Sequence, residues 1–148
     1  MKYTKIISAF PACGKTHFYG NCKDKVVLDS DSSNFSWLDN GERNPNFPEN
    51  YLEHIKNNIG KADYILVSSH QPVRDALQEE GIEYILILPD SSLKYEWVGR
   101  CFLRGSGEKF CNMLADNWDN WTKESHNEYV VRLKSGQYLS DYIEYVDS

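Results

Sequence analysis

The chain has 148 residues, of which 41% are hydrophobic and 14% aromatic, and its formal net charge at pH 7 is −6. That length predicts a single domain over residues 1–148, with enough chain to bury a core. The acidic charge counts against a broad basic surface that follows a nucleic-acid backbone, and no apolar run reaches the ~18 residues of a membrane helix.

The opening segment "MKYTKIISAF" has an apolar run too short for a secretory signal peptide, so we expect it in the mature structure. The cysteines do not have the spacing of a zinc site; they are Cys13, Cys22, Cys101 and Cys111. We therefore expect reduced thiols in a cytoplasmic protein.

The first predicted strand, Thr4–Ser8, leads into "AFPACGKT". The pattern Gly-x-x-x-x-Gly-Lys-Ser/Thr binds phosphate because backbone N–H groups surround the anion at a helix N-terminus, the lysine reaches the β- and γ-phosphates, and the hydroxyl binds Mg²⁺. Gly14, Lys15 and Thr16 keep the second half of the pattern, whereas Ala9 replaces the first glycine and fits there if its φ is negative. A chance Gly-Lys-Thr in a surface turn is the alternative; the strand before the loop favours a nucleoside triphosphate site.

The second predicted strand, Lys25–Leu28, leads into "LDSDSS", where one residue separates Asp29 from Asp31. Two acids at this spacing in an extended chain point the same way. One can hold a magnesium-bound water while the other accepts a proton from an attacking hydroxyl, and phosphoryl transfer needs both tasks. A solvated acidic turn is the alternative, and the phosphate loop upstream favours the catalytic interpretation.

Further along the chain, helical and extended patterns alternate. Apolar residues at helical spacing predict helices over 48–60, 71–81 and 107–121, the last with an apolar face that we expect in the core: Phe110, Met113, Leu114, Trp118 and Trp121. Apolar runs predict strands at Tyr64–Ser68, Tyr84–Leu88 and Tyr129–Leu133. This alternation predicts an α/β fold with a mostly parallel sheet.

Four segments together resemble the small P-loop kinases, the group that includes shikimate, gluconate and nucleoside monophosphate kinases, and also the compact kinase-like proteins of bacteriophages. The segments are "AFPACGKT", "LDSDSS", "KYEWVGRCFLRG" and "VVRLKSGQYLSDYI", and they extend over nearly the whole chain. The resemblance implies a five-stranded parallel sheet in the order 2-3-1-4-5 between helices, with ATP and Mg²⁺ as cofactors. It also implies the nucleotide-binding residues, which are Ala12, Cys13, Gly14, Lys15, Thr16, Ser135, Gly136 and Gln137.

Arg100 and Arg104 are four residues apart, so on a helix they share a face. An exposed arginine pair on a surface helix, with no catalytic role, is the alternative. The resemblance instead implies that both arginines belong to a mobile lid, at about residues 93–107, that closes over ATP and acts with Lys15 on the transferring phosphoryl group.

The resemblance implies different roles for the two acids. Asp29, together with Thr16, would organise magnesium, and Asp31 would contact the acceptor. We therefore predict an ATP-dependent phosphotransferase whose acceptor is a small molecule, a nucleoside or nucleoside monophosphate. The long polar loop at about 34–50 would bind that acceptor, since loops of this length are commonly functional. Arg43 and Arg74 are the candidates for an acceptor phosphate.

Two other functions stay open at this stage. A kinase of a nucleic-acid hydroxyl would need a basic channel, and the acidic composition counts against it. A nucleotide-binding regulatory module with little turnover would not need Asp31, Arg100 and Arg104, which the chain retains. We expect a monomer or homodimer without a membrane partner.

Overall fold

The computed structural model describes residues 4–14, 18, 25–30, 38–124 and 128–142. Five strands form one sheet in the order β2-β3-β1-β4-β5, and every neighbouring pair is parallel. The strands are β1 (Lys5–Ala9), β2 (Val27–Asp29), β3 (Tyr64–Ser68), β4 (Ile85–Pro89) and β5 (Tyr129–Leu133). The predicted fold class and strand order are therefore confirmed.

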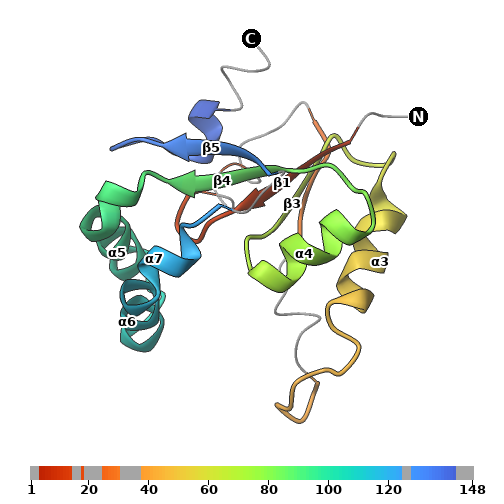
Figure 1. Ribbon diagram of the computed structural model, residues 1–148, viewed down its shortest axis with the longest axis horizontal. Helices are drawn as coiled ribbons and strands as arrows, with labels where there is room; N and C mark the ends of the chain where they lie inside the picture. The colour runs from red at the N-terminus through yellow and green to blue at the C-terminus, as the bar shows by residue number, and fades with distance from the viewer. Residues whose placement is uncertain (1–3, 15–17, 19–24, 31–37, 125–127, 143–148) are drawn as a thin grey trace.

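The labelled helices are α3 (Glu49–Asn58), α4 (Gln71–Glu79), α5 (Lys94–Leu103), α6 (Glu108–Asp116) and α7 (Trp118–Trp121), with a short 3-10 helix η1 (Ser91–Leu93) before α5. Figure 1 shows α5, α6 and α7 gathered beyond the arrowhead of β4, whereas α3 and α4 lie together on another side of the sheet. In the described part of the chain, no helix is long and apolar enough to cross a membrane.

The sheet is buried because its central strands are apolar on both faces. Residues Ile65–Val67 of β3 and Leu86–Leu88 of β4 are fully buried, as expected for parallel strands that helices cover on both sides. Helix α3 packs on this core through Tyr51, Leu52 and Ile55, which recur at helical spacing.

The single helix predicted over 107–121 is wrong in one respect, because Asn117 divides it into α6 and α7. The Asn117 side-chain amide donates to the carbonyl of Met113 at 2.8 Å, and its backbone leaves the helical region, with φ −106° and ψ 11°. Such side-chain bonds to the backbone compete with helix continuation. Of the predicted apolar face, Leu114 and Trp118 are buried, whereas Met113 is 42% exposed.

All strands run in the same direction, so their carboxyl ends meet at one edge of the sheet. The segments that leave this edge begin at Phe10, Ser30, Ser69, Asp90 and Lys134. Ligands of open parallel α/β sheets bind outside this edge.

Candidate phosphate-binding site

Ala9 stands where the phosphate-loop pattern has its first glycine, and the structure explains why alanine is accepted there. Ala9 is the last residue of β1, where it pairs with Ser68 of β3 and Ile87 of β4. The backbone is extended in a strand, so no positive φ is needed, and the side chain is buried in the core. The condition that we set for alanine at this position is met.

The sharp bend comes three residues later. Ala12 has φ 63° and Gly14 has φ 94°. Alanine rarely adopts this left-handed conformation, which costs roughly 1–2 kcal/mol. The carbonyl of Gly14 then accepts from the backbone N–H of Phe18 at 2.9 Å, a spacing of four residues that begins a helical turn. The chain therefore leaves a central strand through a strained bend, and Lys15 and Thr16, which follow the bend, lie outside the described residues.

The segment after β5 packs on this bend. The backbone N–H of Leu139 donates to the carbonyl of Cys13 at 2.8 Å. A Cβ atom added to Gly14 would lie 3.2 Å from Cδ1 of Tyr138, so the tyrosine ring rests directly on the glycine. The predicted nucleotide-binding residues from the two ends of the chain, 12–14 and 135–137, thus belong to neighbouring segments.

Arg100 also reaches the bend. Its guanidinium carbon lies 3.8 Å from the ring centre of Trp97 and 4.0 Å from that of Tyr138, so the cation is held between two aromatic rings. Its Nη1 donates to the carbonyl of Ala12 at 3.5 Å, and Nη2 pairs with Glu96 at 3.0 Å. Arg100 is buried beside the loop.

Arg104, by contrast, is exposed at the end of α5. Its Nε donates to Ser106 Oγ, and its guanidinium lies 5.7 Å from the ring centre of Phe110. The structure therefore brings Arg100 but not Arg104 to the bend. Trp97 and Cys101 anchor α5 in the core, whereas residues 102–105 and 107 are exposed, and the lid at about 93–107 stays a prediction.

The predicted acids follow β2. Asp29 is the last residue of that strand and is partly buried, and Asp31 lies outside the described residues. Three hydrogen bonds hold Ser30, which lies between the two acids. Its N–H donates to the carbonyl of Leu66 at 2.9 Å, and its own carbonyl accepts from the hydroxyl of Tyr51. Its Oγ lies 3.0 Å from Nε2 of His54. This anchoring fixes the direction of the chain between the two acids.

No group of three or more His, Cys, Asp or Glu side chains that could hold a metal is found within the described ranges. Thr16 and Asp31 fall outside those ranges. The two predicted magnesium residues, Thr16 and Asp29, remain a prediction. Cys13, Cys101 and Cys111 are buried free thiols.

The loop after β5 is organised by one carboxylate. Glu96 accepts from Ser135 Oγ at 2.6 Å and from the backbone N–H of Gly136 at 3.0 Å, and these bonds hold the pKa of Glu96 below its usual value. Gln137 accepts from the N–H of Lys134 at 2.8 Å, which closes the turn. These donors of Ser135 and Gly136 therefore bind a side chain of the protein, Glu96.

The structure does not support the predicted contact of Arg74 with an acceptor phosphate. Arg74 is buried, and its Nε donates to Glu128 Oε2 at 2.7 Å while Nη2 bonds Oε1 of the same carboxylate. Burial alone lowers the pKa of Arg74, but the hydrogen bonds and negative charge of Glu128 outweigh it and raise the pKa. Arg74 therefore ties α4 to the start of β5.

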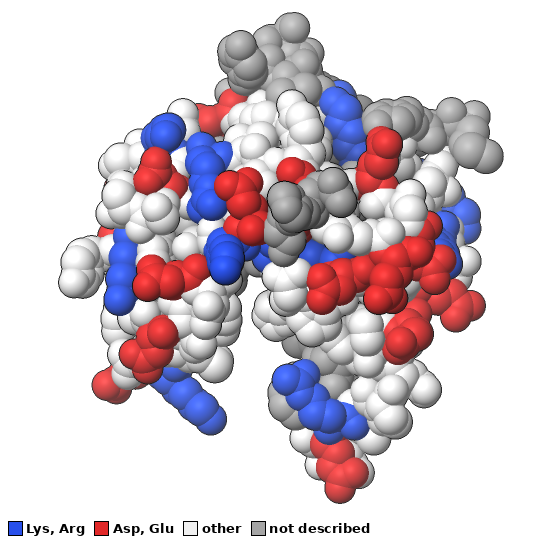
Figure 2. Space-filling view, in the orientation of Figure 1, with Lys and Arg blue, Asp and Glu red and all other residues white. Residues whose placement is uncertain are grey.

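In the predicted acceptor loop, Arg43 is exposed, as an acceptor-binding cation requires. Phe47, however, packs on the core, with its ring centre 6.1 Å from that of Tyr51. Phe35 and Trp37 lie outside the described residues. Figure 2 shows a cleft between the surface over α5–α7 and the surface over α4 and residues 38–48.

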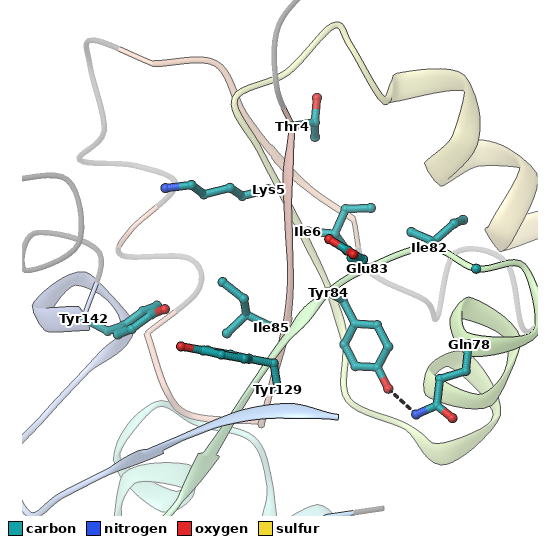
Figure 3. Close-up of a pocket in the computed structure, with 11 residues that line it drawn as sticks. Thr4, Lys5, Ile6, Gln78, Ile82, Glu83, Tyr84, Ile85, Tyr129 and Tyr142 are labelled. Carbon is teal, nitrogen blue, oxygen red and sulfur yellow. Dashed lines mark hydrogen bonds between the residues drawn. The ribbon is translucent and has the colours of Figure 1, made fainter. Parts of the chain in front are cut away.

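A second hollow, of about 760 Å³, lies at the opposite edge of the sheet. It is lined from the amino ends of β1, β4 and β5, and includes Lys5, Tyr84 and Tyr129 (Figure 3). Gln78 Nε2 donates to the hydroxyl of Tyr84 at 2.9 Å, and both side chains line the hollow. None of the predicted site residues that the structure describes lines it.

Sequence reasoning missed Glu96, Trp97 and Tyr138, which surround Arg100. The spacing of Glu96 and Arg100 on a helix, i and i+4, was a usable signal for their ion pair. Tyr138 gave no such signal, because it meets Arg100 only through the tertiary fold.

The strand order and the bend after β1 define an α/β P-loop fold. The chain is similar to a gluconokinase from Sinorhizobium meliloti 1021, with a TM-score of 0.55 and 13% identity over 97% of this chain and 87% of that one. It is also similar to a sugar kinase from a Janibacter species, with a TM-score of 0.59 and 13% identity over 99% and 92% of the two chains. A third similar structure is an uncharacterized protein from Eubacterium ventriosum, with a TM-score of 0.52 and 14% identity over 99% of both chains. No protein-family model and no curated protein matches the sequence.

Proposed function

We propose that this protein is an ATP-dependent kinase that transfers the γ-phosphate of ATP to a hydroxyl group of a small molecule. The bend at Ala12 and Gly14 is the observation that carries this proposal, because it lies at the carboxyl end of β1, directly before Lys15 and Thr16. Backbone N–H groups in such a bend, at the start of a helical turn, favour an anion. The fold shared with a gluconokinase and a sugar kinase supports the same class of reaction.

In this proposal Lys15 binds the β- and γ-phosphates, and Thr16 and Asp29 hold Mg²⁺, which neutralises phosphate charge when bound. The acceptor oxygen attacks the γ-phosphorus, the bond to the β–γ bridging oxygen breaks, and the acceptor proton passes to Asp31, leaving ADP. Arg100 stabilises negative charge from its place beside the bend.

The acceptor is the finer part of the proposal. A nucleoside or nucleoside monophosphate remains the first candidate, with Arg43 as the contact for its phosphate. Arg74 no longer supports it, because that cation is bound to Glu128. A sugar or sugar acid is the second candidate, since two of the similar structures are described as a gluconokinase and a sugar kinase.

The test is release of ADP from MgATP in the presence of nucleosides, nucleoside monophosphates, sugars, sugar acids and oligonucleotides, each tried separately. We expect release to depend on one class of small acceptor and to be lost in Lys15→Met, with far-UV circular dichroism unchanged. Oligonucleotide-dependent release would indicate a nucleic-acid kinase. MgATP binding without any acceptor-dependent release would indicate a regulatory module, and full activity in Lys15→Met would refute the phosphate-loop assignment.

The two acids are separated by a paired measurement. Asp31→Asn is nearly isosteric but cannot accept the proton, so we expect it to keep MgATP affinity and to lose transfer by about 10²–10⁴-fold. Asp29→Asn should instead raise the Mg²⁺ concentration needed for half-maximal activity. Loss of MgATP affinity in Asp31→Asn with normal affinity in Asp29→Asn would reverse the two roles.

A further inference from the structure

Among the described residues, the carboxylate of Glu96 bonds both Arg100 and the loop after β5. On one side it pairs with Arg100 Nη2 at 3.0 Å. On the other it accepts from Ser135 Oγ at 2.6 Å and from the N–H of Gly136 at 3.0 Å. An ionised carboxylate only accepts hydrogen bonds, so a single group satisfies three donors from two segments.

The two segments joined by Glu96 both touch the phosphate-loop bend. Arg100 donates to the carbonyl of Ala12 at 3.5 Å, and the ring of Tyr138, which lies over the same guanidinium at 4.0 Å, rests on Gly14. A change in the position of either segment must therefore change what surrounds the bend.

A buried donor beside this cluster has no acceptor among the described residues. The indole N–H of Trp97, whose ring stacks on Arg100 at 3.8 Å, is fully buried and unpaired in that part of the chain. Native proteins rarely leave a buried donor unsatisfied. Because the ring of Trp97 lies on Arg100, the fluorescence of Trp97 reports on the surroundings of Arg100 without any need for turnover.

We propose that Glu96 is a positioning residue that holds Arg100 and the Ser135–Tyr138 turn as one unit against the phosphate loop, and thereby couples nucleotide binding to the placement of Arg100. The inference rests on the proposed function, since it takes MgATP as the ligand of the bend. Glu96 itself touches no reacting atom in this assignment.

Glu96→Gln is the sharpest test, because it keeps the shape but replaces one acceptor oxygen by a donor. The amide keeps one acceptor oxygen and carries no charge, so it cannot accept from Arg100, Gly136 and Ser135 together, and its bond to Arg100 no longer joins opposite charges. We expect the Kd for MgATP to rise about tenfold, as befits loss of a charge-assisted hydrogen bond. Ser135→Ala, which removes one donor and keeps the carboxylate, should give a smaller rise in the same direction. Glu79→Gln, an exposed carboxylate at the end of α4, is the matched control and should bind as the parent does.

A double-mutant cycle distinguishes a residue that acts through Arg100 from one that only stabilises the fold. We expect Glu96→Gln to have little further effect on MgATP affinity and kcat in an Arg100→Ala background, because coupled residues are non-additive. MgATP should also change tryptophan emission in the parent but not in Trp97→Phe, and the change should shrink in Glu96→Gln.

The outcomes separate the two levels of inference. Parent-like MgATP affinity in both Glu96→Gln and Ser135→Ala overturns the coupling and leaves the proposed kinase intact. Additive effects of Glu96→Gln and Arg100→Ala also overturn it. A parent protein that neither binds MgATP nor releases ADP overturns the kinase proposal and this inference together. If Glu96→Gln does not fold, Ser135→Ala in the same cycle gives the decision.

Discussion

Replacement of Glu128 by alanine tests the buried ion pair that anchors helix α4 to the start of β5. The side chains of Arg74 and Glu128 are 2% and 0% exposed, and the guanidinium binds both carboxylate oxygens. Tyr84 donates a further hydrogen bond to the same carboxylate, and Arg74 Nη2 also donates to the carbonyl of Lys123 at 3.2 Å. Loss of Glu128 would leave the arginine charge buried with a single carbonyl acceptor among these contacts.

Removing one partner of a buried ion pair costs about 3–5 kcal/mol of unfolding free energy, because the remaining charge stays desolvated. For a domain of this length each kcal/mol lowers the Tm by about 2–4 °C, so we expect Glu128→Ala to melt roughly 6–20 °C below the parent. The assay is thermal and urea unfolding followed by far-UV circular dichroism at pH 7. Arg74→Met with Glu128→Leu removes both charges, and we expect that double variant to recover most of the loss.

The matched control is the exposed pair Lys56–Glu80, whose nitrogen and oxygen lie 2.6 Å apart and whose side chains are 45% and 44% exposed. Water screens this pair, so Glu80→Gln should change stability by less than about 1 kcal/mol. If Glu128→Ala loses no more stability than Glu80→Gln, the buried pair does not hold α4 as we describe. The reasoning also fails if the double variant is less stable than Glu128→Ala alone.

Three other changes test separate parts of the structure. Burial raises the pKa of Tyr84 to about 12 from its ordinary 10, so its contribution to the unfolding free energy, about 3 kcal/mol, is present below pH 10 and lost as the pH rises to 12. Tyr84→Phe should flatten that part of the stability profile, and an unchanged profile would contradict the assignment. Gly14→Ala should weaken MgATP binding and lower the unfolding free energy in urea by about 1–2 kcal/mol, because φ is 94° and the added Cβ meets Tyr138. Ala12→Gly should not destabilise the protein, and equal effects of the two variants would argue against the bend. In the proposed lid, Arg104 reaches the phosphates only when the lid closes over ATP, so Arg104→Ala should lower kcat, and it should leave the Tm unchanged because the side chain is exposed; a lower Tm with normal kcat would make it a structural residue.

Much of the fold could be predicted because the strands are apolar runs with clear ends. Tyr64–Ser68 and Tyr129–Leu133 have the predicted bounds, and the remaining strands differ by one or two residues at their ends. The break at Asn117 could not be read from apolar spacing, because Leu114 and Trp118 keep the same face on both sides of it. It depends on a side-chain bond to Met113 that competes with the helix.

The site was harder to predict, because its residues take their roles from distant partners. Arg74 and Arg43 look equivalent in the sequence, and the difference between them is Glu128, which lies 54 residues beyond Arg74. Arg100 and Arg104 share a helix, but only Arg100 meets an aromatic ring from the far end of the chain, Tyr138. Motif spacing predicts a phosphate loop, whereas tertiary packing decides which cation lies beside the bend.

The position of β1 in the middle of the sheet has a consequence for how the chain folds. Lys5 pairs with Tyr64, and Ile7 pairs with Ile85, so both neighbours of the first strand are synthesised long after it. Pairings between such distant residues close large loops and slow folding. The bend at Ala12 and Gly14 leaves β1, and its outer support from Tyr138 and Leu139 is the last described part to be made. During synthesis the bend therefore gains its outer support only after Leu139 has been made. A ribosome-bound fragment that ends before β4 contains β3 but lacks both the other partner strand of β1 and the segment that packs on the bend.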